Sequence, residues 1–148
     1  MFCYQKYKSS DQKIYQDSLR LRNELLRLPI GKSIYDEDLS LEKDNDFYGV
    51  FQEEQLIGTL SFYEKAPFVA QLTAFAVAEN FQGVGLGSKL VAFLIDDLKS
   101  QGYRKITVAA RATAKDFYQK CGFTILKGPL LNPQLDVIDY EMLYVIKA

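Results

Sequence analysis

Residues 80–90 read Asn80-Phe-Gln-Gly-Val-Gly-Leu-Gly-Ser-Lys-Leu90 and join an apolar run to a strongly apolar, helix-like pattern. Gly83, Gly85 and Gly87 allow the backbone to approach a ligand closely, because no side chain stands in the way. The first N–H groups of a helix have no partner within it, and the positive end of the helix dipole also favours an anion. This local chemistry predicts a site for a phosphate or pyrophosphate.

The spacing of the glycines distinguishes between kinds of phosphate-binding loop. A Walker loop ends in Gly-Lys-Ser/Thr, whereas here Ser88 precedes Lys89. A dinucleotide fingerprint needs a third glycine where Ser88 stands, and it follows a strand more closely than residues 79–82 allow. The pattern Gln82-x-x-Gly85-x-Gly87 instead resembles the pyrophosphate loop of the GCN5-related N-acetyltransferase (GNAT) family. The alternative is a glycine-rich turn between a strand and a helix, with no ligand.

A second motif supports the same resemblance. Residues 114–123 read Ala114-Lys-Asp-Phe-Tyr-Gln-Lys-Cys-Gly-Phe123 and resemble the family's A-x-x-F-Y-x-K-x-G-F segment. A predicted helix and a predicted strand separate the two motifs, as the family requires. The resemblance covers about residues 47–146 and is weaker in the N-terminal third.

The composition excludes several classes of protein. The chain has 148 residues, of which 48% are hydrophobic, so we expect one packed domain over residues 1–148. The net charge of −1 argues against a protein that holds nucleic acid by neutralising phosphates. There is no histidine, which excludes a histidine-based catalytic triad, a histidine-ligated metal and a histidine general base.

The cysteines and the apolar stretches indicate the compartment. The N-terminus lacks the apolar core of a signal peptide, and no apolar stretch reaches the ~18 residues that a membrane span needs. Cys3 and Cys121 are the only cysteines, and they do not have the spacing of metal ligands. We therefore expect a reduced, cytoplasmic protein that binds neither a membrane nor a metal.

The periodicity of apolar residues predicts alternating strands and helices. Strands are predicted at residues 2–7, 47–51, 55–63, 68–77, 105–110, 123–126 and 140–146, and helices at residues 10–28, 86–100 and around 114–121. We expect a hairpin turn at residues 52–54, and a loop with Gly128, Pro129 and Pro133 before the last strand. The order indicates an α/β (α+β) protein with a mixed central sheet of six to seven strands and helices on both faces, as in the GNAT fold.

Local signals predict where the helices begin and end. Ser9-x-x-Gln12 is typical of a capping box at the start of the first helix, which Pro29 and Gly31 are expected to end. Thr113 is expected to cap the third helix, and Gly122 to stop it.

The resemblance implies acetyl-CoA as co-substrate and an amine as acceptor. The backbone of the glycine loop would hold the pyrophosphate. The edge of the preceding strand would pair with the pantetheine arm, and one of its N–H groups would polarise the thioester carbonyl. Phe117 would pack against the sheet or the pantetheine. The residues implied for binding acetyl-CoA are Phe75, Ala76, Val77, Gln82, Gly83, Val84, Gly85, Gly87, Ser88, Arg111 and Phe117.

Tyr118 is the residue that the resemblance implies for catalysis. A tyrosine with a reference pKa of about 10 can donate a proton to a leaving thiolate with a reference pKa of about 8.5. The alternative is a buried aromatic residue whose hydroxyl is hydrogen-bonded to the backbone.

Four basic residues have two interpretations each. Arg111 stands where many family members have an asparagine, and it could bind CoA or an acidic acceptor, or be a solvated charge at a strand end. Lys115 could reach a CoA phosphate or remain exposed. Arg22 and Arg27 could face an acidic acceptor or lie on the solvated side of the first helix.

The general base is left open by the sequence. Glu64, Glu79, Asp139 and Glu141 could each order a water that removes the amine proton, or be ordinary surface charges. A related subgroup often has a histidine three residues before its C-terminal methionine, and counting back from Met142 that position is Asp139. The role either passes to a carboxylate or does not exist in this chain.

The sequence therefore predicts an acyl-CoA-dependent N-acetyltransferase that moves acetyl from acetyl-CoA to an amine of a small molecule or peptide by direct attack. The alternative is a non-catalytic module that binds or senses acyl-CoA. The family also includes dimers, so a homodimer is one possibility. The acceptor and the acyl-chain preference are not specified by these motifs.

Overall fold

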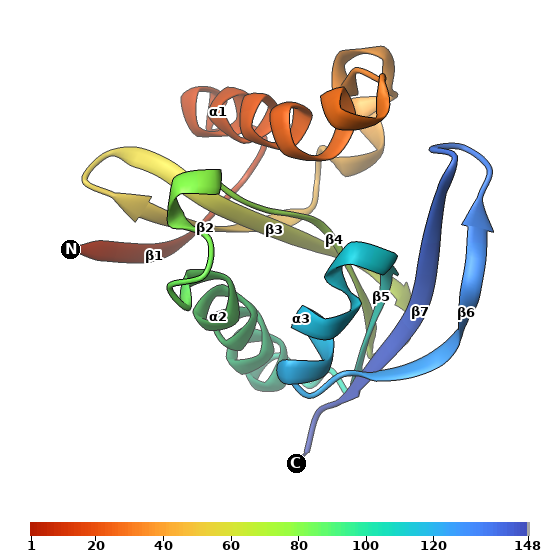
Figure 1. The fold of residues 1–148 in the computed structure, drawn as a ribbon. Helices are drawn as coiled ribbons and strands as arrows, with labels where there is room; N and C mark the ends of the chain where they lie inside the picture. The colour runs from red at the N-terminus through yellow and green to blue at the C-terminus, as the bar shows by residue number, and fades with distance from the viewer. Residues whose placement is uncertain (148) are drawn as a thin grey trace.

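The seven strands of the computed structural model form one mixed sheet with helices on both faces, and residues 1–147 are described (Figure 1). The strand order is β1-β2-β3-β4-β5-β7-β6, in which only β4 and β5 run parallel. The elements are β1 Phe2–Tyr7, α1 Gln12–Arg22, β2 Asp46–Gln52, β3 Gln55–Ala66, β4 Val69–Val77, α2 Leu86–Ser100, β5 Lys105–Arg111, α3 Lys115–Lys120, β6 Thr124–Asn132 and β7 Val137–Val145. The predicted fold class and its sheet are confirmed.

Alternating side chains of the sheet supply two separate cores. Leu90, Leu94 and Leu98 of α2 are fully buried against one face. Tyr15 and Leu19 of α1 pack on the opposite face, in a cluster with aromatic residues of β2. Burying a leucine side chain stabilises the fold by about 1.5–3 kcal/mol, so burial of these two apolar faces holds α1 and α2 against the sheet.

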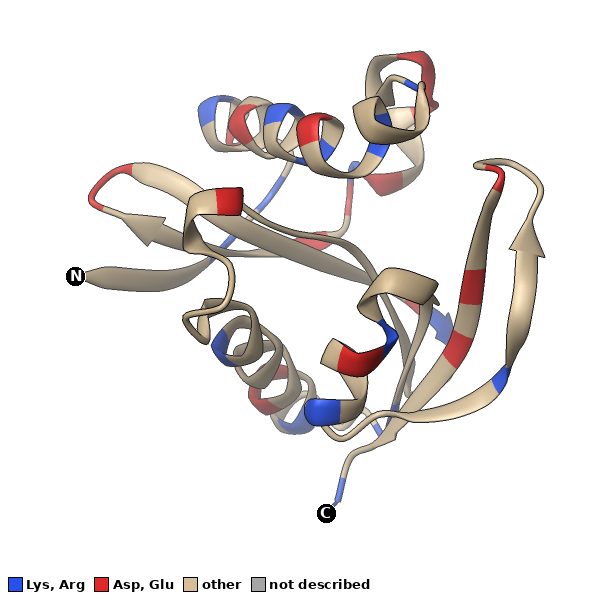
Figure 2. Ribbon diagram, viewed as in Figure 1, with Lys and Arg blue, Asp and Glu red and all other residues tan. Residues whose placement is uncertain are grey.

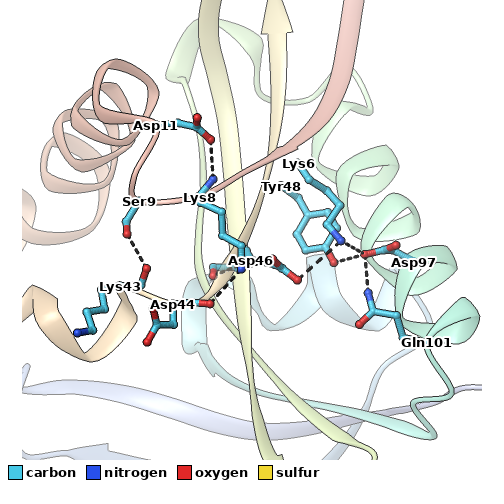
Figure 3. Close-up of polar contacts among 11 residues, drawn as sticks. Lys6, Lys8, Ser9, Asp11, Lys43, Asp44, Asp46, Tyr48, Asp97 and Gln101 are labelled. Atoms are coloured by element: carbon cyan, nitrogen blue, oxygen red, sulfur yellow. Dashed lines mark hydrogen bonds and ion pairs between the residues drawn. The ribbon is translucent and has the colours of Figure 1, made fainter.

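A polar network also joins α2 to the strands (Figure 3). Asp97 of α2 accepts hydrogen bonds from the hydroxyl of Tyr48 on β2 and from Lys6 Nζ of β1, the second at 2.9 Å. Gln101 Nε2 donates to the same carboxylate at 2.9 Å. Burial opposes ionisation of Asp97, but the hydrogen bonds from Tyr48 and Lys6 outweigh it and hold its pKa below the usual value.

The start of the first helix differs from the prediction. Asp11, not Ser9, is the residue before α1, and its carboxylate accepts the Lys8 N–H at 2.9 Å. The predicted capping box is wrong, because the helix begins after Asp11 and no side chain caps it, and the Ser9 hydroxyl instead donates to the Lys43 carbonyl at 2.6 Å. The helical path continues beyond Arg22 as a π turn at Asn23–Arg27 and a 3-10 turn at Leu28–Ile30. Gly31, with φ of 74°, then ends it as predicted.

The ends of the third helix are partly as predicted. Thr113 does not cap α3, because it lies within a 3-10 turn at Ala112–Ala114 and Ala114 occupies the cap position. Gly122 does stop the helix, with φ of 98°. Its N–H donates to the Gln119 carbonyl at 3.0 Å, which belongs to a Schellman motif.

The predicted loop between the last two strands is mostly strand. β6 continues through Gly128-Pro129 to Asn132 and pairs with β7, leaving only residues 133–136 as the turn. β6 is one of the two edge strands, and its register shifts on both sides of Lys127. An edge strand with bulges tolerates a proline, because its outer N–H positions have no partner to lose.

Charges of both signs are interspersed along α1 (Figure 2). Asp17 forms local ion pairs with Lys13 and Arg20, whereas Arg22 at the end of α1 pairs with the distant Glu42. Among residues 1–147, no helix is both long and apolar enough to cross a membrane.

Candidate active site

The sheet opens between its two parallel strands. β4 and β5 pair only from Val69 to Leu72 against Lys105 to Val108, although β4 continues to Val77. The cause is a bulge: β4 has one extra residue opposite the β3 segment between Thr59 and Ser61. Ala74 lies in this bulge with φ of 59°, and bulges bend the strand that carries them. The β4 edge at residues 73–77 is therefore free of pairing with β5.

The glycine loop follows this free edge. Gly83 and Gly85 have φ of 81° and 87°, and a Cβ built on either would meet no atom within 4 Å. Both glycines therefore turn the chain tightly beside open space. Gln82 Nε2 donates to the Val77 carbonyl at 2.8 Å, so this side chain ties the loop to the end of β4.

Gly87 serves close packing rather than a turn. A Cβ on it would lie 3.1 Å from the Phe75 ring and 3.3 Å from the Phe117 ring. These two rings stack at 5.1 Å between centroids. The first helical hydrogen bond of α2 runs from Lys89 N to the Gly85 carbonyl at 3.2 Å. The N–H groups of residues 86–88 therefore take no part in the hydrogen bonds of the helix.

A cavity of about 660 Å³ lies along the free edge, the glycine loop and the start of α2. Most residues implied for acetyl-CoA line it: Phe75, Ala76, Val77, Gln82, Gly83, Gly85, Gly87, Ser88 and Phe117. Val84 does not line it and points its side chain to solvent. Arg111 lies elsewhere. We call this space the glycine cavity.

A second cavity of about 310 Å³ lies on the other side of Phe75, between β4, β5, β7 and the π turn. We call it the Tyr118 cavity. Both cavities are lined by Phe75 and Ala114, together with Leu25, Leu26 and Thr113, so they adjoin at these residues. An elongated ligand in one cavity can thus meet a ligand in the other.

Tyr118 lies in this cavity at 4% exposure. Its ring packs against Phe117 and Phe123, with centroid distances of 5.3 Å and 5.4 Å. Within residues 1–147 its hydroxyl makes no hydrogen bond, so the alternative of a hydroxyl bonded to the backbone is wrong. Burial raises the pKa of Tyr118 above its ordinary value, which keeps the group protonated at neutral pH.

Of the four candidate bases, the structure brings only Asp139 to the Tyr118 cavity. Asp139 is 9% exposed, and its Oδ2 accepts from Asn132 Nδ2 at 3.0 Å. Glu64 instead accepts from the Tyr103 hydroxyl at 3.1 Å, and Glu79 lies in the turn before the glycine loop. Glu141, two residues beyond Asp139 on β7, lines neither cavity.

The arginines occupy more specific positions than surface charges would. Arg111 lines the Tyr118 cavity rather than the glycine cavity, and its Nη2 donates to the Leu26 carbonyl at 2.7 Å. Arg22 is buried and pairs with both oxygens of Glu42 at 2.8 Å, so its interpretation as a solvated residue is wrong. Burial, followed by the nearby charge of Arg27, lowers the pKa of Arg111.

Two further positions carry roles that the sequence did not reveal. Lys115 lies over the ring of Tyr140 at 4.9 Å, a cation–π contact. Asn132 lines the Tyr118 cavity and orients the carboxylate of Asp139. Its local signal is weak, because an asparagine before a proline is typical of any turn.

The comparison with protein families decides the relationship. The profile of the acetyltransferase (GNAT) family matches residues 12–123. The chain belongs to this family. An uncharacterized acetyltransferase of Streptococcus pyogenes serotype M1 is 26% identical over 74 residues, which are 50% of this chain and 52% of that protein. The chain thus matches about half the length of such curated relatives.

Solved GNAT structures share the fold. The crystal structure of Escherichia coli ElaA superposes with a TM-score of 0.82 at 17% identity, covering 97% of this chain and 99% of that one. An aminoglycoside 6'-N-acetyltransferase complexed with coenzyme A gives 0.82 at 14% identity, covering 99% and 98%. At these identities the likeness concerns the fold, so the chemistry must be argued from the site.

Proposed function

We propose that this GNAT protein is an acetyl-CoA-dependent N-acetyltransferase that acts on an amine of a small molecule or peptide. The observation that carries the proposal is the opening between β4 and β5, where the glycine cavity and the Tyr118 cavity adjoin at Phe75. One cavity suits the donor and the other the acceptor, and a reaction between the two needs such a meeting point.

The glycine cavity has the features that a diphosphate-bearing thioester requires. The open backbone at Gly83 and Gly85 and the N-terminus of α2 favour the diphosphate. The free edge at residues 75–77 offers backbone groups to the pantetheine amides, as an added strand would use them. An N–H of this edge would polarise the thioester carbonyl, and such donors contribute about 3–4 kcal/mol.

Tyr118 and Asp139 would handle the two protons of the reaction. The amine nitrogen forms the new C–N bond at the thioester carbon, and the C–S bond breaks. The thiolate takes the proton of the Tyr118 hydroxyl, which burial keeps protonated. The surplus proton of the nitrogen passes to Asp139 directly or through one water. Asp139 then releases its proton to solvent and Tyr118 regains one from solvent, which returns both residues to their starting states and completes the balance.

A thermal melt with millimolar acetyl-CoA tests the donor site. A ligand at 100 times its dissociation constant stabilises the native state by about 2.7 kcal/mol, so a clear rise in Tm is expected. Desulfo-CoA should give a similar rise, and ATP, which lacks the pantetheine arm, little. If neither CoA compound shifts Tm, the glycine loop is structural and the proposal fails.

Release of CoA thiol in the presence of amines then tests the enzyme. Binding of acetyl-CoA with no release for any amine would favour the alternative, a module that senses acyl-CoA. Rates with propionyl-CoA and succinyl-CoA measured beside acetyl-CoA test the acyl group, and a preference for either longer donor would contradict the acetyl assignment.

A further inference from the structure

Two opposite charges lie side by side in the wall of the Tyr118 cavity without forming an ion pair within 4.0 Å in the described part of the chain. Arg111 and Asp139 are direct partners in the antiparallel register of β5 and β7, so both side chains lie on the same face of the sheet. Both line the cavity. Among residues 1–147, however, no acidic oxygen lies within 4.0 Å of the Arg111 guanidinium, although its partner strand places a carboxylate directly opposite.

Among residues 1–147, Arg111 is the cation that lines this cavity without an ion pair. Arg22 is neutralised by both oxygens of Glu42, and Arg27 is neutralised by Glu37. Arg111 gives one N–H to the Leu26 carbonyl, and its other N–H groups have no protein partner in the described part of the chain. The carboxylates of Asp139 and Glu37 act on Arg111 only from beyond ion-pair distance. A half-buried guanidinium in this position favours a closer anion, because that anion would offset its desolvation.

A second group in the wall of the same cavity can bind the other end of such a ligand. Asp139 is 9% exposed and lines the cavity, and Asn132 uses only its Oδ2, so Oδ1 has no protein partner in the described part of the chain. A carboxylate oxygen of this kind accepts hydrogen bonds from an amine.

We propose that the acceptor is a small amine that also carries a carboxylate, as an amino acid does. Its carboxylate would bind Arg111, and its nitrogen would lie between Asp139 and Tyr118. This assignment rests on the proposed function and names the acceptor class for the same site. The cavity of about 310 Å³ is at the small end of ligand pockets, which suits an acceptor of this size.

The test compares matched acceptors. Free L-amino acids and the corresponding L-amino acid amides differ in the anionic group and, because of it, in the pKa of the amine. Thiol release from acetyl-CoA reports turnover of each, and rates are compared at equal concentrations of the unprotonated amine. We expect kcat/KM for the best carboxylate acceptor to exceed that of its amide by about 10- to 100-fold, the range of a hydrogen bond to a charged group. Arg111→Gln should reduce this ratio to about one through a higher KM for the carboxylate.

Two controls keep the outcomes separate. Arg20→Gln removes an arginine from the solvated side of α1 and should leave the ratio unchanged. Arg111→Gln should retain the Tm shift with acetyl-CoA, because Arg111 does not line the glycine cavity. A lowered Tm of the variant without ligand would show a folding defect, and Arg111→Lys, which retains the charge but not the fork, would then carry the test. An unchanged Tm without ligand but a lost shift with acetyl-CoA would assign Arg111 to the donor and overturn the acceptor inference.

Each result has a defined consequence. If acetyl-CoA does not shift Tm of the parent protein, the proposed function fails first. If acetyl-CoA binds but amides or simple amines react as well as amino acids, or if no amino acid reacts, the acceptor inference is overturned and the donor assignment stands. An unchanged ratio in a folded Arg111 variant would also overturn it.

Discussion

Replacing Tyr118 with Phe should separate catalysis from stability. The hydroxyl makes no hydrogen bond within residues 1–147, so its removal leaves no protein partner unpaired. The ring contacts with Phe117 and Phe123 are retained in the variant. We therefore expect the free energy of unfolding to change by less than about 1 kcal/mol. Tyr118 also lies outside the glycine cavity, so the Tm shift with acetyl-CoA should remain.

Turnover should behave differently. Positioned proton transfer contributes about 100- to 10,000-fold, which corresponds to about 2.7–5.4 kcal/mol of activation free energy. The assay is thiol release under saturating acetyl-CoA, measured beside urea denaturation of the same preparation. Tyr144→Phe is the matched control, because Tyr144 packs on the same Phe123 ring at 5.4 Å but lines neither cavity. Turnover within about threefold of the parent in Tyr118→Phe would refute a proton-donor role.

Three further substitutions test the packing and the charges. Gly87→Ala should destabilise by about 1 kcal/mol in urea, because overpacking against Phe75 costs about 1–3 kcal/mol and helix propensity returns about 1; unchanged stability would mean that the rings yield freely. Asp97→Asn should lower the free energy of unfolding most near neutral pH and little in acid. Because the pKa of Asp97 in the folded protein is below its usual value, its contribution is present above about pH 4 and is lost as pH falls through that folded-state pKa. An equal loss of unfolding free energy at pH 3 and pH 7 would contradict this. Glu42→Gln should cost about 3–5 kcal/mol by leaving Arg22 buried without its counter-ion, and a loss below 1 kcal/mol would show that water replaces the carboxylate.

The sequence predicted the fold well where the signal is local and periodic. Leu90, Leu94 and Leu98 recur at helical spacing, and all three are fully buried in α2. The errors lie where a distant segment competes. Ser9 is a good cap residue, but the helix begins after Asp11 and the Ser9 hydroxyl donates to the carbonyl of the distant Lys43. Pro129 interrupts a strand in general, but not an edge strand, and edge position is a property of the whole sheet.

The candidate site shows the same division. The glycine loop and Tyr118 could be found from short motifs, and the structure places them around two adjoining cavities. Choosing Asp139 from four carboxylates needed the register of β7 on β5, which no local pattern encodes. The position of the Arg111 side chain was harder to predict, because it depends on a hydrogen bond to the Leu26 carbonyl, in a π turn far away in the sequence.

The opening of the sheet depends on one strained residue. Ala74 has φ of 59°, a conformation that costs an alanine roughly 1–2 kcal/mol. β3 pairs with β4 on both sides of the bulge, from Val77 back to Ala76 and again from Thr73, so the ladder holds the strained residue in place. The added residue bends β4 away from β5 and places Phe75 between the two cavities. A regular strand here would continue the parallel pairing beyond Leu72 and close the space that both proposed substrates need. The strained residue therefore lies where the sheet opens to form the two cavities, and the hydrogen bonds between β3 and β4 offset the cost of its conformation.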